Sequence, residues 1–304
     1  MLRKVVSMHT VFRTMMFSLV LACGPVGHSG TLFREGVRET PSVEREMVVV
    51  PGGPFWQGID VAELDDVVAL CEAHAVEGAC DREALLEHHR SETPRRRVDL
   101  AAFEIDRTEV TDAAYARCVA AGACTPIDYG ACTFFRNDEA LLGGELAPER
   151  RAADMPVVCV RWQDAHDFCA WQGKRLPSEL EWEKAARGTE GRRFPWGDAW
   201  DDTRASWYDD EQGTRDGFAT TSPVGSFPAG ASPYGALDMA GNVWEWVADP
   251  ASEAEQASGR TRVMRGGGYA AKPIALRTTK RVAQRPAGFE NLGFRCARGD
   301  ASPT

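Results

Sequence analysis

Several features that define common protein classes are missing from this sequence of 304 residues. Its formal net charge is −10, whereas nucleic-acid binding requires a basic surface that neutralises phosphates. We interpret the one dense basic run, Arg95-Arg96-Arg97, as solvated surface charge. After residue 23 no apolar run is long enough to cross a bilayer. The sequence therefore indicates neither a nucleic-acid partner nor a membrane-spanning helix in the body of the chain.

Motifs of common active sites are missing as well. No two cysteines have the Cys-x2-Cys spacing of a zinc knuckle, and no Gly-x-Ser-x-Gly nucleophile motif occurs. The glycines that follow Arg265 have no nucleotide-binding context. The six histidines lack the spacing of a metal-binding helical site, and we expect His88-His89 to be an exposed pair.

The first 23 residues have the pattern of an export signal. Three basic residues precede a short apolar stretch, Met15–Ala22. The following Cys23 resembles the acylated cysteine of a bacterial lipobox, although Leu21 is an unusual occupant of its position. We therefore expect an exported lipoprotein of the periplasm or cell surface, attached to the membrane only through a lipid on Cys23. The alternative is an ordinary cleaved signal peptide that discards this cysteine.

Export permits disulfides. Apart from Cys23 the chain has eight cysteines, at positions 71, 80, 118, 124, 132, 159, 169 and 296. Eight cysteines allow about 105 pairings, and their spacing alone does not choose among them. Cys71 with Cys80 and Cys118 with Cys124 are plausible local pairs, and a zinc site is the competing interpretation.

The rest of the chain divides into a linker, residues 24–44, and one domain, residues 45–299. The linker has few aromatic residues, and the domain begins with a short strand-like run, Met47–Val50, closed by Pro-Gly-Gly. Residues 62–95 are interpreted as an insertion, because apolar residues at helical spacing there surround an acidic loop flanked by Cys71 and Cys80.

Three further helices are predicted in the domain. Thr111 has the position of a helix N-cap, and a second helix is expected over residues 163–172. Ser178 and Glu181 form a capping box for a third helix that ends at Gly188. Beyond this glycine no long helical pattern returns, so we expect loops held by tryptophans, bound cations or disulfides.

Eight short blocks of sequence then occur in an order that is similar to one known family. They are Met47–Gly58 (MVVVPGGPFWQG), Arg107–Thr111 (RTEVT), Pro156–Trp162 (PVVCVRW), Gly173–Arg187 (GKRLPSELEWEKAAR), Phe194–Gly197 (FPWG), Gly241–Trp246 (GNVWEW), Arg265–Gly268 (RGGG) and Gly293–Cys296 (GFRC). Together they resemble the formylglycine-generating enzyme (sulfatase-modifying factor) family over about residues 46–298. The resemblance implies an α+β, loop-rich fold related to C-type lectins, with little regular secondary structure and with structural calcium.

Two calcium sites are implied by this resemblance. The first would use the carboxylates of Asp238 and Glu245 and the carbonyl groups of Gly241 and Val243, an oxygen set that suits a hard cation. The alternative is that both carboxylates bond neighbouring backbone groups or arginines.

The second implied calcium site would combine Asp216 and Phe218 with residues 205–207. It lacks one ligand, because Ala205 stands where the family has an asparagine.

The resemblance also implies a disulfide between Cys169 and Cys296. Catalytic members oxidise a substrate cysteine with copper held by two thiolates that follow the arginine–glycine motif within about a dozen residues, since thiolates select copper(I). No cysteine lies between Cys169 and Cys296 here, so we expect neither bound copper nor formylglycine formation.

The resemblance also implies a cleft at the position of the family's active site. Four arginines are candidates for lining this cleft and binding a carboxylate: Arg265, Arg277, Arg281 and Arg295. The alternative is that they form structural salt bridges. We expect a non-catalytic binding or scaffold protein with an unidentified protein or small-molecule ligand, recognised by the cleft or by the insertion. An oxidoreductase acting on an exported protein or small molecule is the alternative.

Overall fold

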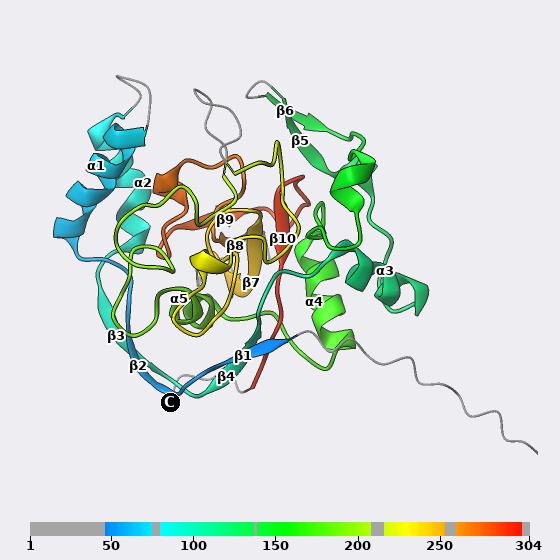
Figure 1. Cartoon of the computed structure of the whole chain (residues 1–304), viewed down its shortest axis with the longest axis horizontal. Helices are drawn as coiled ribbons and strands as arrows, with labels where there is room; N and C mark the ends of the chain where they lie inside the picture. The colour runs from blue at the N-terminus through cyan, green and yellow to red at the C-terminus, as the bar shows by residue number, and fades with distance from the viewer. Residues whose placement is uncertain (1–45, 75–79, 137–138, 208–215, 253–259, 300–304) are drawn as a thin grey trace, which may run out of the picture. The chain divides into compact units, whose positions relative to one another are not determined.

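The computed structural model describes residues 46–74, 80–136, 139–207, 216–252 and 260–299. The expected export signal, Cys23 and the linker of residues 24–44 lie outside the described residues. The fold combines short helices and strands with long loops, and Figure 1 shows the helices of the insertion at one side of a small central sheet and a second helical pair at the other side.

Five α-helices occur in the described residues. They are α1 (Leu64–His74), α2 (Arg82–His89), α3 (Asp112–Ala120), α4 (Trp162–Trp171) and α5 (Glu179–Arg187). The predicted caps are present: the Thr111 hydroxyl accepts a hydrogen bond from the Ala114 N–H, and the Ser178 hydroxyl accepts one from the Glu181 N–H. The carboxylate of Glu181 accepts in return from the Ser178 N–H, which completes the capping box.

Eleven short strands are described. They are β1 (Met47–Val50), β2 (Gly53–Gln57), β3 (Arg96–Leu100), β4 (Phe103–Asp106), β5 (Thr133–Arg136), β6 (Glu139–Leu142), β7 (Trp244–Pro250), β8 (Arg262–Arg265), β9 (Arg281–Gln284), β10 (Leu292–Phe294) and β11 (Ala297–Arg298). The largest sheet has the order β10-β7-β8-β9, with β10 parallel to β7 and the other pairs antiparallel. A three-stranded sheet has the order β1-β4-β11, so the last strand pairs with one near the start of the domain.

The central sheet is formed by a region of the chain for which the sequence predicted mainly loops. Strand β7 begins with four consecutive buried residues, Trp244 to Val247, so its sequence lacks the alternation that marks a strand with one exposed face. Trp246 is fully buried and donates its indole N–H to the carbonyl of Val160, 3.0 Å away. The tryptophans therefore anchor this region as expected, but they do so from a sheet.

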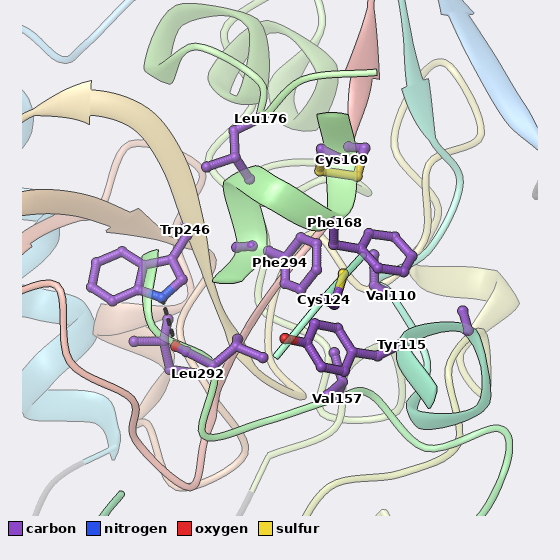
Figure 2. Packing of buried hydrophobic residues seen from close by; sticks show 14 of the residues in the cluster. Val110, Tyr115, Cys124, Val157, Phe168, Cys169, Leu176, Trp246, Leu292 and Phe294 are labelled. Carbon is purple, nitrogen blue, oxygen red and sulfur yellow. Dashed lines mark hydrogen bonds between the residues drawn. A yellow bond between two sulfur atoms is a disulfide. The ribbon is translucent and has the colours of Figure 1, made fainter. Parts of the chain in front are cut away.

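The main apolar core packs α3 and α4 against β7 and β10. Phe168 of α4 contacts Phe294 of β10 edge-to-face, with ring centroids 5.4 Å apart, and Tyr115 of α3 stacks on Phe168. Figure 2 shows these rings together with the Cys169 disulfide. This disulfide joins α4 to Cys296, which lies between β10 and β11.

All eight cysteines of the described residues form disulfides, which join Cys71 to Cys80, Cys118 to Cys124, Cys132 to Cys159 and Cys169 to Cys296. The last pair is the one that the family resemblance implied. Four disulfides indicate that the chain folds in an oxidising compartment. Among the described residues, none of the helices is both long and apolar enough to span a bilayer.

Removing the Cys169–Cys296 bridge should destabilise the domain more than removing the Cys71–Cys80 bridge. The two bridges close sequence separations of 127 and 9 residues, for which the loop-entropy model gives about 4–5 and about 2–3 kcal/mol. Chemical unfolding of the double variants Cys169→Ala/Cys296→Ala and Cys71→Ala/Cys80→Ala measures the difference. An equal or larger loss for the Cys71–Cys80 pair would contradict this order.

Candidate functional site

The segment that follows Arg265 is where the family resemblance places the copper-binding thiolates of catalytic members. Strand β8 ends at Arg265, and Gly266 and Gly267 have φ angles of 92° and 73°, which let the chain turn sharply away from the sheet. The chain continues through a 3-10 turn, Pro273–Ala275, towards β9. Because every cysteine of the described residues is in a disulfide, none of them offers a thiolate to this segment.

Helix α1 of the insertion packs on this segment. Leu276 is fully buried in one apolar cluster with Leu70 of α1 and Trp207, and Ala271 packs against the same cluster. Val67 of α1 lies in a neighbouring apolar cluster with Ile274. The segment is therefore covered by aliphatic and aromatic side chains where a redox metal site would need polar or sulfur ligands.

A buried polar network fixes the insertion to the same segment. Glu92, at the end of the insertion, accepts hydrogen bonds from the Arg277 guanidinium at 2.8 and 3.0 Å and from the Thr279 hydroxyl at 2.7 Å. Burial alone would raise the pKa of Glu92, but the adjacent Arg277 guanidinium holds it well below its usual range. Glu92 is therefore ionised, and its charge is neutralised inside the protein by Arg277.

His89 belongs to this network, which corrects the expectation of an exposed His88-His89 pair. Its side chain is buried, with Nδ1 2.7 Å from a Glu92 oxygen and 3.4 Å from the Lys280 amine. Burial lowers the pKa of His89 and, against the raising effect of Glu92, lowers the pKa of Lys280 to about 8. No sequence pattern indicates the contact between Glu92 and Arg277, because the two residues are 185 positions apart.

The four predicted cleft arginines do not gather at one cleft. Arg265 pairs with Glu183 at 2.7 Å, and Arg281 pairs with Glu179 at 2.7 Å. Arg277 pairs with Glu92, and Arg295 pairs with Glu245 at 2.6 Å. Arg265, Arg277 and Arg295 are almost completely buried. The arrangement matches the alternative interpretation, in which these arginines form structural salt bridges.

Glu245, an expected calcium ligand, has both oxygens engaged within the protein. The Arg295 guanidinium donates to both of them, at 2.6 and 2.7 Å, and the Trp182 indole N–H donates at 2.9 Å. Arg295 also donates to the backbone carbonyl of Leu237, next to Asp238. A guanidinium thus supplies the positive charge that the resemblance assigned to calcium, so the arrangement of Glu245 does not fit a calcium site.

Asp238, its expected partner ligand, lies beside a second buried carboxyl group that the sequence did not indicate. Asp238 accepts from the Gly225 N–H at 2.6 Å, and Glu109 accepts from the Asn242 side-chain amide at 3.0 Å. Burial raises the pKa of both groups, and the charge of Asp238 raises the pKa of Glu109 further. Two carboxyl groups buried this close together do not both ionise readily, so protonation of one of them is favoured in the folded protein.

At the second expected calcium site the carboxylate is also engaged by groups of the protein itself. The Asp216 carboxylate accepts from the backbone N–H of Trp207 at 3.0 Å and from that of Phe218 at 2.9 Å. Asp216 thereby joins residues 205–207 to residues 216–218 directly, which is the structural role that a calcium ion would have there. Ala205 is buried and adds no side-chain ligand. Among the described residues, no group of three or more His, Cys, Asp or Glu side chains is arranged to bind a metal.

The largest open cavity among those described, which we call the Tyr269 pocket, lies beside the segment after β8. Its volume is about 540 Å³, and apolar side chains line much of it, including Met155, Phe218 and Pro223. Tyr269 contributes its ring, over which the Arg150 guanidinium lies 5.3 Å from the centroid. The remaining charged lining residues are the acids Glu145, Glu149 and Asp154. Arg150 is neutralised by a buried salt bridge to Glu290, so the pocket presents a net negative charge.

A model of the sulfatase-modifying factor enzyme 1-like domain matches residues 34–300. The chain belongs to this family. It is 33% identical over 313 residues to the formylglycine-generating enzyme of Streptomyces coelicolor, with 86% of this chain and 92% of that protein aligned. It is also 40% identical over 165 residues to the inactive C-alpha-formylglycine-generating enzyme 2 of Bos taurus, with 51% of this chain and 54% of that protein aligned. The chain thus spans about half the length of this inactive relative.

Solved structures agree with the family assignment. PvdO from Pseudomonas aeruginosa superposes with a TM-score of 0.59 at 28% identity, covering 84% of this chain and 95% of that one. The expected α+β, loop-rich fold of the formylglycine-generating enzyme family is therefore confirmed.

Asp238→Asn should raise the melting temperature above that of the unmodified protein at about pH 8 and change it little at about pH 5. Because the pKa of Glu109 is raised on folding, its contribution to stability is complete below the unfolded-state pKa and is lost as pH rises. An asparagine removes the neighbouring charge and still accepts from the Gly225 N–H. Thermal unfolding at both pH values, with and without chelator, measures the effect.

Asp65→Asn, which changes an exposed carboxylate of α1, is the matched control. We expect chelator to leave the melting temperature of the unmodified protein unchanged. A fall on chelation that Asp238→Asn abolishes would instead establish the calcium site of Asp238 and Glu245.

Proposed function

We propose that this chain is a non-catalytic, exported member of its family that acts by binding a ligand. The observation that carries this proposal is the burial of the segment after β8 under helix α1, with Leu276 and Leu70 in one apolar cluster. A copper site there would require two thiolates and access for substrate and oxygen. The described residues offer no thiolate, because their eight cysteines are paired.

The Tyr269 pocket is the surface on which we propose that the ligand binds. It remains open beside the covered segment, and its mixture of apolar side chains with Glu145, Glu149 and Asp154 favours a ligand that has an apolar part and a positive charge. A basic peptide segment of an exported protein has this chemistry. Burial of the apolar part would contribute affinity, and the acidic residues would select the charge.

An oxidoreductase is the second candidate function. Its support is the identity of 33% to the Streptomyces coelicolor formylglycine-generating enzyme, which extends over nearly the whole of both chains. No cysteine lies between Cys169 and Cys296. For this chain to act as an oxidoreductase of that kind, residues other than cysteine would have to hold the metal there. Fold similarity alone does not decide between the two functions, because activity depends on the residues of the site.

Purified protein incubated with Cu(I), oxygen and a Cys-x-Pro-x-Arg peptide should leave the peptide mass unchanged, because no thiolate pair holds copper. The serine version of the same peptide should nevertheless bind, and replacing its arginine by glutamate should weaken binding by at least about tenfold, which corresponds to about 1.4 kcal/mol. Mass spectrometry and fluorescence anisotropy provide the two measurements. Copper-dependent aldehyde above a denatured control would refute the non-catalytic assignment.

Asp154→Asn tests whether this binding occurs in the Tyr269 pocket. This variant should reduce the preference for arginine over glutamate, whereas Asp167→Asn, on the exposed face of α4, should not. Equal binding of the arginine and glutamate peptides would show that the pocket does not select a positive charge.

Cys23 is proposed to carry the lipid anchor. Cys23→Ser should move the protein from the membrane fraction to the soluble fraction and abolish incorporation of radiolabelled palmitate, since acylation requires the thiol. A protein that stays in the membrane fraction without this cysteine, or that is never labelled, would contradict a lipoprotein. Soluble export with normal disulfides would then support the ordinary cleaved signal.

A further inference from the structure

A second cavity, which we call the insertion cavity, lies between the insertion and the loop that follows α5. Its volume is about 310 Å³. The insertion contributes Asp66 and Arg95, and the body of the domain contributes Arg187, Gly191 and Arg193. Four arginines and four carboxylates line it, with few apolar side chains. The cavity is separate from the Tyr269 pocket, so the ligand proposed there and a ligand here can each be tested alone.

Two guanidinium groups approach each other above Gly191. A β-carbon built on this glycine would lie 2.9 Å from Nη2 of Arg95 and 3.5 Å from Nη2 of Arg187. The space between the two groups is therefore open only because residue 191 has no side chain. Gly191 has a φ of 84°, which also disfavours any other residue there.

The positive charge at this point is only partly compensated. Arg187 donates to Glu183 and to the carbonyl groups of Gly58 and Gly191, but its Nε has no hydrogen-bond partner among the described residues. Arg187 is buried, and burial lowers its pKa; the Glu183 carboxylate opposes this shift, and the charge of Arg95 adds to it. An added carboxylate between the two guanidinium groups would relieve this repulsion.

Arg95 is the less constrained of the two groups. Its ion pairs with Glu63 and Asp60 are 3.6 and 3.8 Å long, which exceeds hydrogen-bond distance, and its Nε also has no partner among the described residues. The side chain lies over the Trp56 ring, 5.3 Å from the centroid, and this contact holds it in place. Arg95 was interpreted from the sequence as solvated surface charge, whereas its side chain is only 26% exposed.

The other wall of the cavity carries the opposite charge. Asp66 accepts from the Arg193 guanidinium at 2.6 Å, Asp198 accepts from the Arg193 backbone N–H at 3.0 Å, and Glu190 also lines this wall. Glu190 is paired with the Arg192 guanidinium at 3.0 Å, so on this side of the cavity two carboxylates each have one arginine and Asp198 has a backbone N–H. An ammonium group placed here could donate hydrogen bonds to carboxylate oxygens without displacing other segments of the protein.

The geometry points to a site for a small zwitterion, specifically a free α-amino acid. Its carboxylate would lie above Gly191 between Arg95 and Arg187, and its ammonium group would face Asp66, Asp198 and Glu190. The polar lining disfavours a purely apolar ligand, and the acidic wall disfavours a polyanion. Because α1 forms one side of the cavity, the site depends on the insertion, so the insertion both covers the family cleft and creates this new site.

Thermal shift with each of the protein amino acids in turn should identify at least one that raises the melting temperature, and isothermal titration should then give its affinity. Arg95→Gln should weaken that binding at least about tenfold, because one of the two guanidinium groups is lost. Arg97→Gln, which removes the same charge two positions further along the chain, should leave it unchanged. Each shift is measured against the unliganded melting temperature of the same variant, so a loss of stability does not imitate a loss of binding.

Three results would overturn the proposal. The first is the absence of a shift with every amino acid. The second is equal binding by the analogue that lacks the amino group, which would show that only the carboxylate is recognised. The third is an equal stabilisation by inorganic phosphate that Arg95→Gln removes, which would indicate a simple anion site. Arg95→Gln is expected to weaken amino-acid binding and to leave peptide binding in the Tyr269 pocket unchanged.

Discussion

The contact between Arg295 and Glu245 is the interaction on which most of this loop-rich fold depends. Both side chains are fully buried. The guanidinium group also donates to the backbone carbonyls of Asp106, Arg107 and Leu237, so one side chain joins β7, the end of β4 and the loop before β7. A buried pair of this kind stabilises little by itself, but losing one partner leaves an uncompensated charge, which costs about 3–5 kcal/mol.

Buried ion pairs also join other segments of the domain. Glu92 with Arg277 joins the insertion to the segment after β8, and Glu183 with Arg265 joins α5 to β8. The insertion is thus integrated into the domain through ionic contacts as well as through Leu70. Such integration suits a fixed binding surface better than a lid, because opening it would break the hydrogen bonds that Glu92 accepts from Arg277 and would expose the apolar surface of Leu70 to water.

Local features were predictable from the sequence, and long-range contacts were not. The caps at Thr111 and Ser178 depend on residues three positions apart, so a single stretch of sequence specifies them. Strand β7 was missed because it is buried on both faces. The salt-bridge partners of Arg277 and Arg295 could not be predicted either, because many aspartates and glutamates of the chain could pair with a buried arginine. The Cys169–Cys296 pairing came from family resemblance, which carries the three-dimensional information that spacing lacks.

The position of β11 has a consequence for how the chain is made. This strand pairs with β4 near the start of the domain, and the residues just before it supply Arg295 and Cys296. Until residues 292–298 are synthesised, a growing chain therefore lacks the arginine that pairs with Glu245, the disulfide partner of Cys169 and the strand that pairs with one edge of β4. Folding cannot be completed progressively from the N-terminus, and a chain cut short before Leu292 would be left with buried charges and an unpaired thiol that mark it for degradation.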